Sequence, residues 1–175
     1  MVNEWGIEVD LDKIKAILDM LALKIEKEMR GFMGRLQYIS RFIARLIDIC
    51  EPIFRLLRKN QPTVWNDDYQ LAFETIKEYF LSPHVLVPPT PGRPLLLYLS
   101  ISDMALGCML AQIDDSGKKR AIYYLSKRMV EYEMNYVMIE CLCLALVWAT
   151  RRLRHYMTEY SNAFDIPPRS IEILI

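Results

Sequence analysis

The segment between positions 83 and 94 constrains this chain more than any other feature of its sequence. It contains five prolines and a glycine: Pro83, Pro88, Pro89, Pro91, Gly92 and Pro94. Proline lacks a backbone N–H and fixes φ, so neither a helix nor a central strand can run through the segment. Apolar residues recur at helical spacing before it and in short, strand-length runs after it. The sequence therefore predicts an α+β protein with a domain boundary at this segment.

Apolar periodicity predicts packed helices in the first half of the chain. A stripe with a spacing of three or four residues runs from Met29 to Leu57. Pro52 interrupts this stripe and is more compatible with the first turn of a new helix than with a helix interior. The same period occurs over two shorter segments, residues 10–20 and residues 67–80, and predicts a helix in each. Asp10 can cap the first of these helices.

The second half predicts a three-stranded meander followed by a long helix. Short apolar runs cover residues 95–101, 105–112 and 120–126, and turn residues at 114–117 separate the second run from the third. Helical spacing returns over residues 136–156. An antiparallel sheet packed on one helix accounts for this order of elements.

Charge, cysteine usage and apolar runs exclude several classes of protein. The 22 Lys and Arg residues balance 22 Asp and Glu residues, which argues against a generally basic nucleic-acid coat. The four cysteines lack the paired spacing of a zinc site, so we expect no metal and no other cofactor. The longest apolar run, residues 141–149, is shorter than the roughly 20 residues of a membrane-spanning helix. The first eight residues do not form a secretory signal. We expect an intracellular protein, in cytoplasm or nucleus, with no membrane partner.

Residues 28–43 carry a first family motif. Their sequence, EMRGFMGRLQYISRFI, resembles the F-L-G-x-x-x-Y-x-R-F-I signature of the thumb of gypsy-type reverse transcriptases. Trp65, Ala72, Phe73 and Ile76 then resemble the W-x-x-x-x-x-x-A-F-x-x-I-K pattern of the connection to RNase H.

A second series of motifs follows the proline-rich segment. It comprises G-C-M-L-A-Q at 107–112, I-Y-Y-L-S-K at 122–127, E-M-N-Y at 133–136, Glu140 with Leu144 and Ala145, and R-H-Y at 154–156. In order and separation these are similar to G-x-x-L-x-Q, P-I-x-Y-x-S-R, A-E-x-N-Y, E-x-E-L-L-A and R-H-Y in the RNase H domain of the same family. The resemblance covers most of residues 6–160 and looks closest to plant LTR retrotransposons with a degenerate RNase H.

The resemblance implies a domain organisation. Residues 1–60 correspond to thumb-like helices, 61–92 to a connection helix and Pro-rich linker, 93–160 to an incomplete RNase H-like domain, and 161–175 to a divergent tail. The implied fold is a helical thumb and connection followed by a truncated RNase H-like unit, in which three antiparallel strands pack on a long helix. The parent polyprotein would be an RNA-directed DNA polymerase with RNase H, whose palm domain lies upstream of the thumb and is an implied partner.

The resemblance also locates the RNase H acids. The family holds two Mg²⁺ ions with four carboxylates, and hard cations need such oxygen ligands. The first acid position, seven residues before Gly107, holds Ser100, and the second holds Leu142; neither side chain replaces a charged ligand. The third and fourth acids belong to elements after the long helix, about where this chain ends. We therefore expect no catalytic or metal site, with a shifted site at Asp103 and Glu140 as the weaker alternative.

Basic residues in the first half are candidates for nucleic-acid contact. Nine Lys and Arg stand against four Asp and Glu between positions 24 and 59. Resemblance to the thumb implies that such a face contacts the phosphate backbone, whereas a merely solvated surface is the alternative. The candidate residues are Arg35, Arg41, Arg45, Arg55 and Arg58. Four aromatic residues are expected in the core rather than stacked on bases: Tyr98, Tyr123, Tyr124 and Trp148.

Three functions are compatible with these patterns. The favoured one is a non-catalytic connection module that binds an RNA–DNA hybrid or duplex weakly. A residual metal-dependent RNase H nuclease and a decayed fragment without selected activity are the alternatives.

The expected sheet leaves one strand edge open. Because the family pairs the first strand with a later strand that we expect to be missing here, residues 95–101 would show an unpaired edge and favour self-association. The exception would be a tail, residues 171–175, that folds back as a substitute strand.

Overall fold

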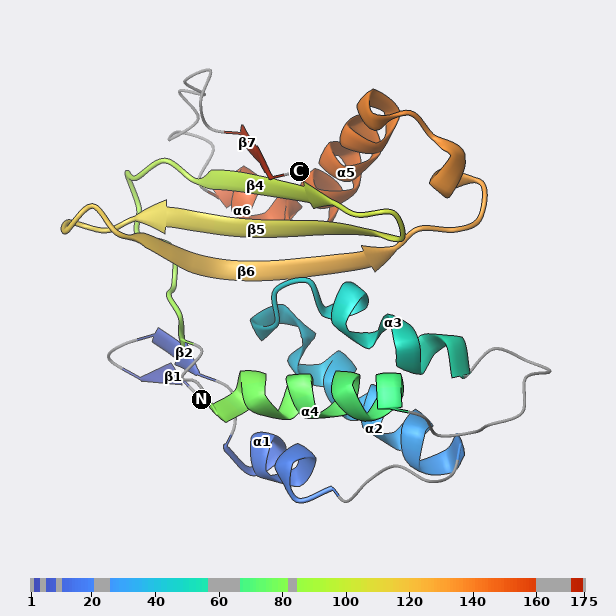
Figure 1. Cartoon of the computed structure of the whole chain (residues 1–175). Helices are drawn as coiled ribbons and strands as arrows, with labels where there is room; N and C mark the ends of the chain where they lie inside the picture. The colour runs from blue at the N-terminus through green and yellow to red at the C-terminus, as the bar shows by residue number, and fades with distance from the viewer. Residues whose placement is uncertain are drawn as a thin grey trace.

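The computed structural model describes residues 2–3, 6–8, 11–20, 26–56, 67–81, 85–159 and 171–174. A helical part precedes the proline-rich segment, and a sheet with two further helices follows it (Figure 1). The helical part lies along one edge of the sheet, and the later helices lie against a sheet face. None of the described helices is both long and apolar enough to cross a membrane.

The helical part contains α1 (Leu11–Leu18), α2 (Glu26–Ile39), the 3₁₀ turn η1 (Ser40–Phe42), α3 (Leu46–Leu56) and α4 (Asp67–Leu81). Apolar residues three or four apart share one face of a helix, and each helix turns that face inward. The faces meet in one buried core: Ile17, Met29, Phe32, Leu36, Ile39, Phe42, Ile43, Leu46, Cys50, Ile53, Ala72, Phe73, Ile76, Phe80 and Leu86. The helices predicted near residues 10–20 and 67–80 are confirmed.

Pro52 lies inside α3, so the prediction that it opens a new helix was wrong. Proline removes one helical hydrogen bond and clashes with the preceding turn. The apolar stripe nevertheless continues across it, because Leu46, Cys50 and Ile53 are all buried in the first core. Packing on both sides of the proline therefore holds a single helix together.

The main sheet has the order β6-β5-β4-β7. Strands β4 (Leu96–Ile101), β5 (Ala105–Ile113) and β6 (Lys119–Arg128) form the predicted antiparallel meander. Strand β7 (Ile171–Leu174) adds to the other side of β4 and runs parallel to it. The sheet thus has one strand more than the sequence led us to expect.

The β5–β6 hairpin is closed by the side chain of Asp114. Its Oδ1 accepts the backbone N–H groups of Ser116 and Lys118, both at 2.9 Å, and its Oδ2 accepts Arg120 Nε at 2.8 Å. Hydrogen bonds from the Ser116 hydroxyl and the Arg120 guanidinium hold the pKa of Asp114 well below its usual range. Gly117 has φ +78°, a left-handed conformation that glycine adopts without strain. The turn predicted at residues 114–117 is confirmed.

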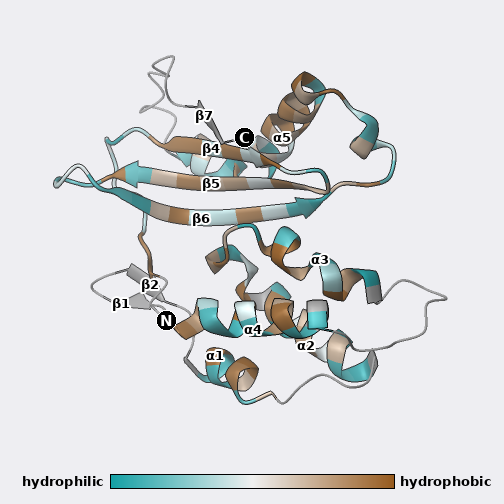
Figure 2. Ribbon diagram, in the orientation of Figure 1, coloured by the Kyte–Doolittle hydropathy of each residue, from teal (hydrophilic) through white to brown (hydrophobic). Residues whose placement is uncertain are grey.

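Helices α5 (Met138–Arg152) and α6 (Arg154–Glu159) cover one face of the sheet. The buried positions Cys141, Ala145 and Ala149 are four residues apart, so one face of α5 carries small side chains and lies close to β4 and β5. Figure 2 shows the apolar residues of β4, β5 and α5 that make up this second core. The long helix predicted over residues 136–156 is confirmed, with a break at Leu153.

A small sheet at the start of the chain was not expected. Its strands β1 (Val2–Asn3), β2 (Gly6–Glu8) and β3 (Val85–Leu86) pair in that order and antiparallel. Strand β3 lies at its edge, where the neighbouring prolines break no ladder hydrogen bond. A two-residue strand is too short to produce the alternating pattern by which strands are predicted.

Strand β6 contributes side chains to both cores. Ala121 and Tyr124 pack against the helical core, whereas Ile122, Tyr123 and Leu125 belong to the core under α5. The register shifts here, since Leu110 pairs with Tyr123 but Ala111 pairs with Ala121, and Ile122 is the extra residue of a β-bulge. The alternation of side chains along β6 supplies both cores, and the bulge places Ala121 on the same face as Tyr124.

The strand that pairs with β4 corrects the prediction that this edge of the sheet is open. Leu97 pairs with Ile171 and Ser100 with Leu174, so the tail provides the substitute strand named as the exception. The tail was difficult to place from sequence because four residues carry almost no pattern.

Glu133, in the 3₁₀ turn η2 (Glu133–Asn135), is a buried carboxylate between β6 and α5. Its Oε1 accepts Lys127 Nζ at 2.6 Å and its Oε2 accepts the backbone N–H of Val130 at 2.9 Å. Burial alone would raise the pKa of Glu133, but the bonds from Lys127 and Val130 outweigh it and lower that pKa. The ionised carboxylate therefore stabilises the fold.

We expect the full chain to be monomeric at tens of micromolar and a variant lacking residues 162–175 to self-associate. The deletion removes β7 and leaves the backbone donors and acceptors of one β4 edge unpaired. Size-exclusion chromatography with light scattering, run on both proteins at matched concentrations, measures this difference. A deletion variant that stays monomeric would show that β7 does not protect the edge.

Acid should destabilise the protein partly through Glu133. A carboxylate with a lowered folded-state pKa adds stability above its unfolded pKa, and this stability is lost as the pH falls through the folded value. Glu133→Gln should therefore lose less stability than the parent chain between about pH 5 and pH 3. Urea unfolding at several pH values tests this, with the exposed neighbour Glu131→Gln as the matched control. Parallel pH profiles for all three proteins would contradict the assignment.

Candidate nucleic-acid interface

The two positions that the resemblance assigns to RNase H acids, Ser100 and Leu142, lie on neighbouring elements of the second core. Ser100 is in β4 and pairs across the ladder with Gly107 of β5, where its Oγ fills the place that a Cβ on Gly107 would take. Leu142 is partly buried on α5, one residue after the buried Cys141. A hydroxyl and an alkyl group thus occupy the two positions that the resemblance assigns to carboxylates.

Asp103 and Glu140, the residues of the alternative shifted site, lie on different elements. Asp103 is exposed in the turn between β4 and β5. Glu140 is engaged at the start of α5, where its Oε2 accepts the backbone N–H of Val137 at 3.1 Å. No group of three or more His, Cys, Asp or Glu residues that could hold a metal occurs in the described part of the chain. These donors do not fit the two Mg²⁺ ions of the family chemistry, which needs several carboxylate oxygens.

Two of the candidate arginines have no carboxylate partner within the described residues. Arg35 Nη1 donates to the backbone oxygen of Ala16 at 2.6 Å, which joins α2 to α1. The guanidinium of Arg41 lies 5.1 Å from the centre of the Phe42 ring. Both side chains are exposed and keep their positive charge available at the surface.

The other described candidates are paired with acids of α3. Arg45 Nε lies 3.2 Å from Asp48 Oδ2, and Arg55 Nε lies 3.0 Å from Glu51 Oε1. Their side chains are 66% and 59% exposed, so these pairs are screened and each guanidinium can still reach an external phosphate. Arg58 lies outside the described residues.

Polar contacts that the sequence did not reveal fix α3 to the sheet. Ser102 Oγ donates to Asp48 Oδ1 at 2.6 Å, and the backbone N–H of Ile47 donates to Ser126 Oγ at 3.2 Å. Arg128 Nη2 bonds Glu51 Oε1 at 3.1 Å. The second oxygen of Glu51, Oε2, is buried and has no hydrogen-bond partner among the described atoms. Asp48 and Glu51 thus hold α3 against the sheet.

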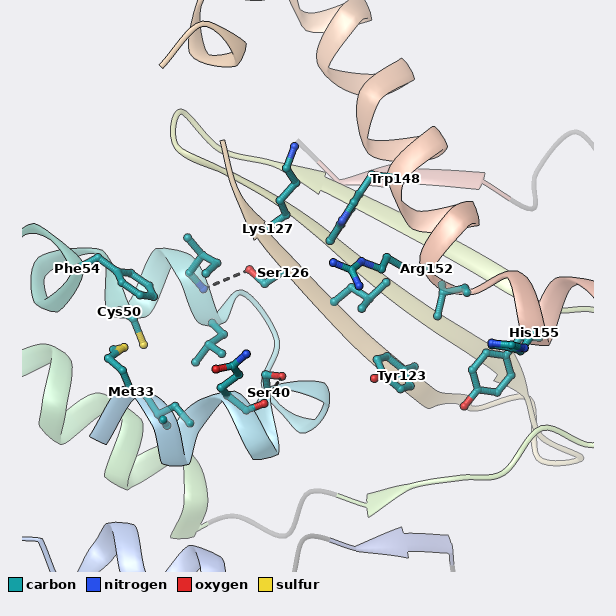
Figure 3. Close-up of a pocket in the computed structure, with 18 of the residues that line it drawn as sticks. Met33, Ser40, Cys50, Phe54, Tyr123, Ser126, Lys127, Trp148, Arg152 and His155 are labelled. Carbon is teal, nitrogen blue, oxygen red and sulfur yellow. Dashed lines mark hydrogen bonds between the residues drawn. The ribbon is translucent and has the colours of Figure 1, made fainter. Parts of the chain in front are cut away.

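A cleft of about 940 Å³ lies between the helical part and the α5–α6 side of the sheet (Figure 3). Four basic side chains lie along its walls, and no Asp or Glu does: Arg30, Lys127, Arg152 and His155. Aromatic side chains lie beside them: Phe54, Tyr123, Trp148 and Tyr156. Tyr123 and Trp148 pack against the second core, as predicted from sequence, but both are only partly buried.

The cleft was missed because its residues are far apart in the sequence. Arg30 comes from α2, Lys127 from β6, and Arg152 and His155 from the end of the long helical segment. The basic residues at the end of α5 were a visible signal, but they also suit the negative end of the helix dipole. Only the packing of the two parts brings these charges together.

Residues 65–166 match the family model described as the RNase H-like domain found in reverse transcriptase. The match covers more than half of the chain, and the chain belongs to this family. It is 29% identical over 165 residues to the transposon Tf2-3 and Tf2-4 polyproteins of Schizosaccharomyces pombe, a match that covers 94% of this chain. The chain spans only 12% of the length of those polyproteins.

Solved structures of foamy viral protease-reverse transcriptase share the fold. One, in complex with an RNA/DNA hybrid, aligns with 98% of this chain and 22% of its own, with a TM-score of 0.73 and 17% identity. Another, in complex with dsDNA, aligns with 98% of this chain and 34% of its own, with a TM-score of 0.71 and 17% identity. The expected mixed fold, with three antiparallel strands and a helical part, is confirmed.

We expect the purified chain to show no ribonuclease H activity with Mg²⁺ or Mn²⁺. Ser100→Asp combined with Leu142→Glu should not restore it, because two acids supply too few ligands for a two-metal site. Cleavage of a labelled RNA–DNA hybrid is the measurement, with a catalytically competent RNase H as the positive control. Metal-dependent cleavage that disappears in Asp103→Asn or Glu140→Gln would establish the shifted site instead.

Proposed function

We propose that this chain is the thumb and connection portion of a gypsy-type retrotransposon polyprotein, and that it contacts the backbone of an RNA–DNA hybrid without cleaving it. In this proposal residues 1–60 form the thumb, 61–92 the connection helix and linker, and 93–160 the RNase H-like domain. An upstream palm domain would complete the polymerase.

The proposal is supported by a folded RNase H-like unit in which Ser100 and Leu142 occupy the positions that the resemblance assigns to two catalytic acids. The four-stranded sheet and α5 are folded around these positions, so the unit can still position nucleic acid or another domain. A nuclease role finds no support in the donor set, because Glu140 caps α5 and Asp103 stands apart in a turn.

The related proteins support the kind of partner. The similar polyproteins are transposon proteins, and the foamy viral enzymes of the same fold were solved with an RNA/DNA hybrid and with dsDNA. We extend this partner to the present chain as a proposal. Recognition would be by charge and helical shape rather than by base sequence.

The exposed arginines support the mode of contact. Arg35 lies in α2, Arg41 in η1 and Arg45 in the turn just before α3, so the three follow one another along the chain. Arg35 and Arg41 carry no ion pair within the described residues, and Arg45 holds only an exposed one. Contact with phosphates would release counterions, so the affinity would fall steeply as salt rises.

Reversal of three charges tests the proposal. The variant Arg35→Glu, Arg41→Glu, Arg45→Glu should abolish binding of a fluorescein-labelled RNA–DNA hybrid, because each change turns an attraction to phosphate into a repulsion. Fluorescence anisotropy at several salt concentrations gives the affinity and its salt dependence.

A variant with the same change in net charge provides the control. Lys118, Lys119 and Arg151 are exposed and lie away from the three arginines in the sequence, and their replacement by Glu should weaken binding far less. Equal losses of affinity in both variants would show that binding depends on net charge alone. A parent chain that does not bind the hybrid even at low salt would favour a decayed fragment.

A further inference from the structure

We infer that the cleft between the helical part and α5–α6 binds a single, unpaired nucleic-acid strand, separate from the duplex contact proposed for Arg35, Arg41 and Arg45. The inference rests on the proposed function, since it adds a second site to a module that handles hybrids. The cleft and its lining side chains are seen in Figure 3.

The charge of the cleft suits a phosphodiester backbone. Arg30 stands on the α2 wall, and Arg152 and His155 stand on the opposite wall, with no carboxylate among the lining residues. Neither Arg152 nor His155 forms an ion pair within the described part of the chain. Lys127 is ion-paired, because its Nζ lies 2.6 Å from Glu133 Oε1. The opposing walls can therefore attract one strand that passes between them.

The aromatic lining suits unpaired bases. Tyr123, Trp148 and Tyr156 are each partly exposed. The rings of Tyr123 and Tyr156 are 6.2 Å apart in an edge-to-face arrangement, so they do not stack on each other face to face. Trp148 lies on α5 one helical turn before Arg152, on the same side of the helix. A base can stack on a ring while its phosphate meets the guanidinium.

The same features argue against a duplex in this cleft. Bases in a double helix stack on one another and present only their edges, so aromatic rings gain little from them. The volume of about 940 Å³ is within the ~300–1,000 Å³ typical of small-molecule sites, which suits a few nucleotides rather than a double helix. Either DNA or RNA could supply the strand, because both offer phosphates and base faces.

Binding of short oligonucleotides tests the inference. Fluorescein-labelled oligo(dT) and oligo(U) of about six nucleotides, within the site sizes of roughly 4–16 nucleotides known for single-strand grooves, are the probes, and the RNA–DNA hybrid is the comparison. Arg152→Glu should weaken oligomer binding roughly tenfold, because it places a negative charge where the strand passes, and should leave hybrid binding almost unchanged.

Arg151→Glu is the matched control, because Arg151 neighbours Arg152 on the same helix, is exposed, and does not line the cleft. Both substitutions place a negative charge at the C-terminal end of α5, so both lose the same favourable interaction with the helix dipole. Trp148→Phe should keep oligomer binding and Trp148→Leu should reduce it, with circular dichroism confirming that both remain folded. The difference between the oligo(dT) and oligo(U) affinities then shows which kind of strand is preferred.

Each outcome decides between the two sites. Loss of oligomer binding in Arg152→Glu together with its retention in the Arg35, Arg41, Arg45 variant supports the separate cleft. Equal effects of Arg151→Glu and Arg152→Glu overturn it, as does a parent chain that binds the hybrid but no oligomer, and in that last case the proposed function stands. A parent chain that binds neither probe overturns both.

Discussion

The rest of the structure depends on strand β6, which packs side chains into both hydrophobic cores. Tyr124 faces the helical core and Tyr123 faces the core under α5, because successive side chains of a strand point to opposite faces. Hydrophobic packing alone would leave the orientation of the two parts loosely set, because it has little direction. The Glu51–Arg128 pair and the Ser126 hydroxyl add direction, since hydrogen bonds require specific geometry. The cleft between the parts exists only because this joint holds them in place.

Uncharged side chains at positions 100 and 142 are compatible with a stable fold. Carboxylates placed close together repel one another, and burying them without a cation costs free energy. Ser100 and Leu142 remove that cost at two partly buried positions, and Ser100 still fits over Gly107. The sheet and the long helix are therefore compatible with uncharged side chains at both positions. Two acids of the helical part, Asp48 and Glu51, bind Ser102 and Arg128 and so attach α3 to the sheet.

Strand β7, in the tail, also stabilises the fold, because it covers one edge of the sheet. A sheet edge formed by the apolar strand β4 would present unpaired N–H and C=O groups to other chains. Strand β7 satisfies them over four ladder positions and lies parallel to β4, although its residues come from the other end of the second half. Edge protection thus depends on a segment that carries none of the family motifs found before it.

The sequence by itself determined the α+β class, the helix and strand segments around the proline-rich boundary, and the absence of acids at positions 100 and 142. These features depend on the local spacing of apolar residues, on the conformational limits of proline and on residue identity. All three can be read directly from the amino-acid sequence. The tertiary structure alone decided that α3 continues through Pro52, that β7 closes the sheet, and that Arg30 and Arg152 face one cleft. Each of these depends on contacts between residues distant in sequence, whose packing free energy outweighs local preference and leaves no periodic signal to read.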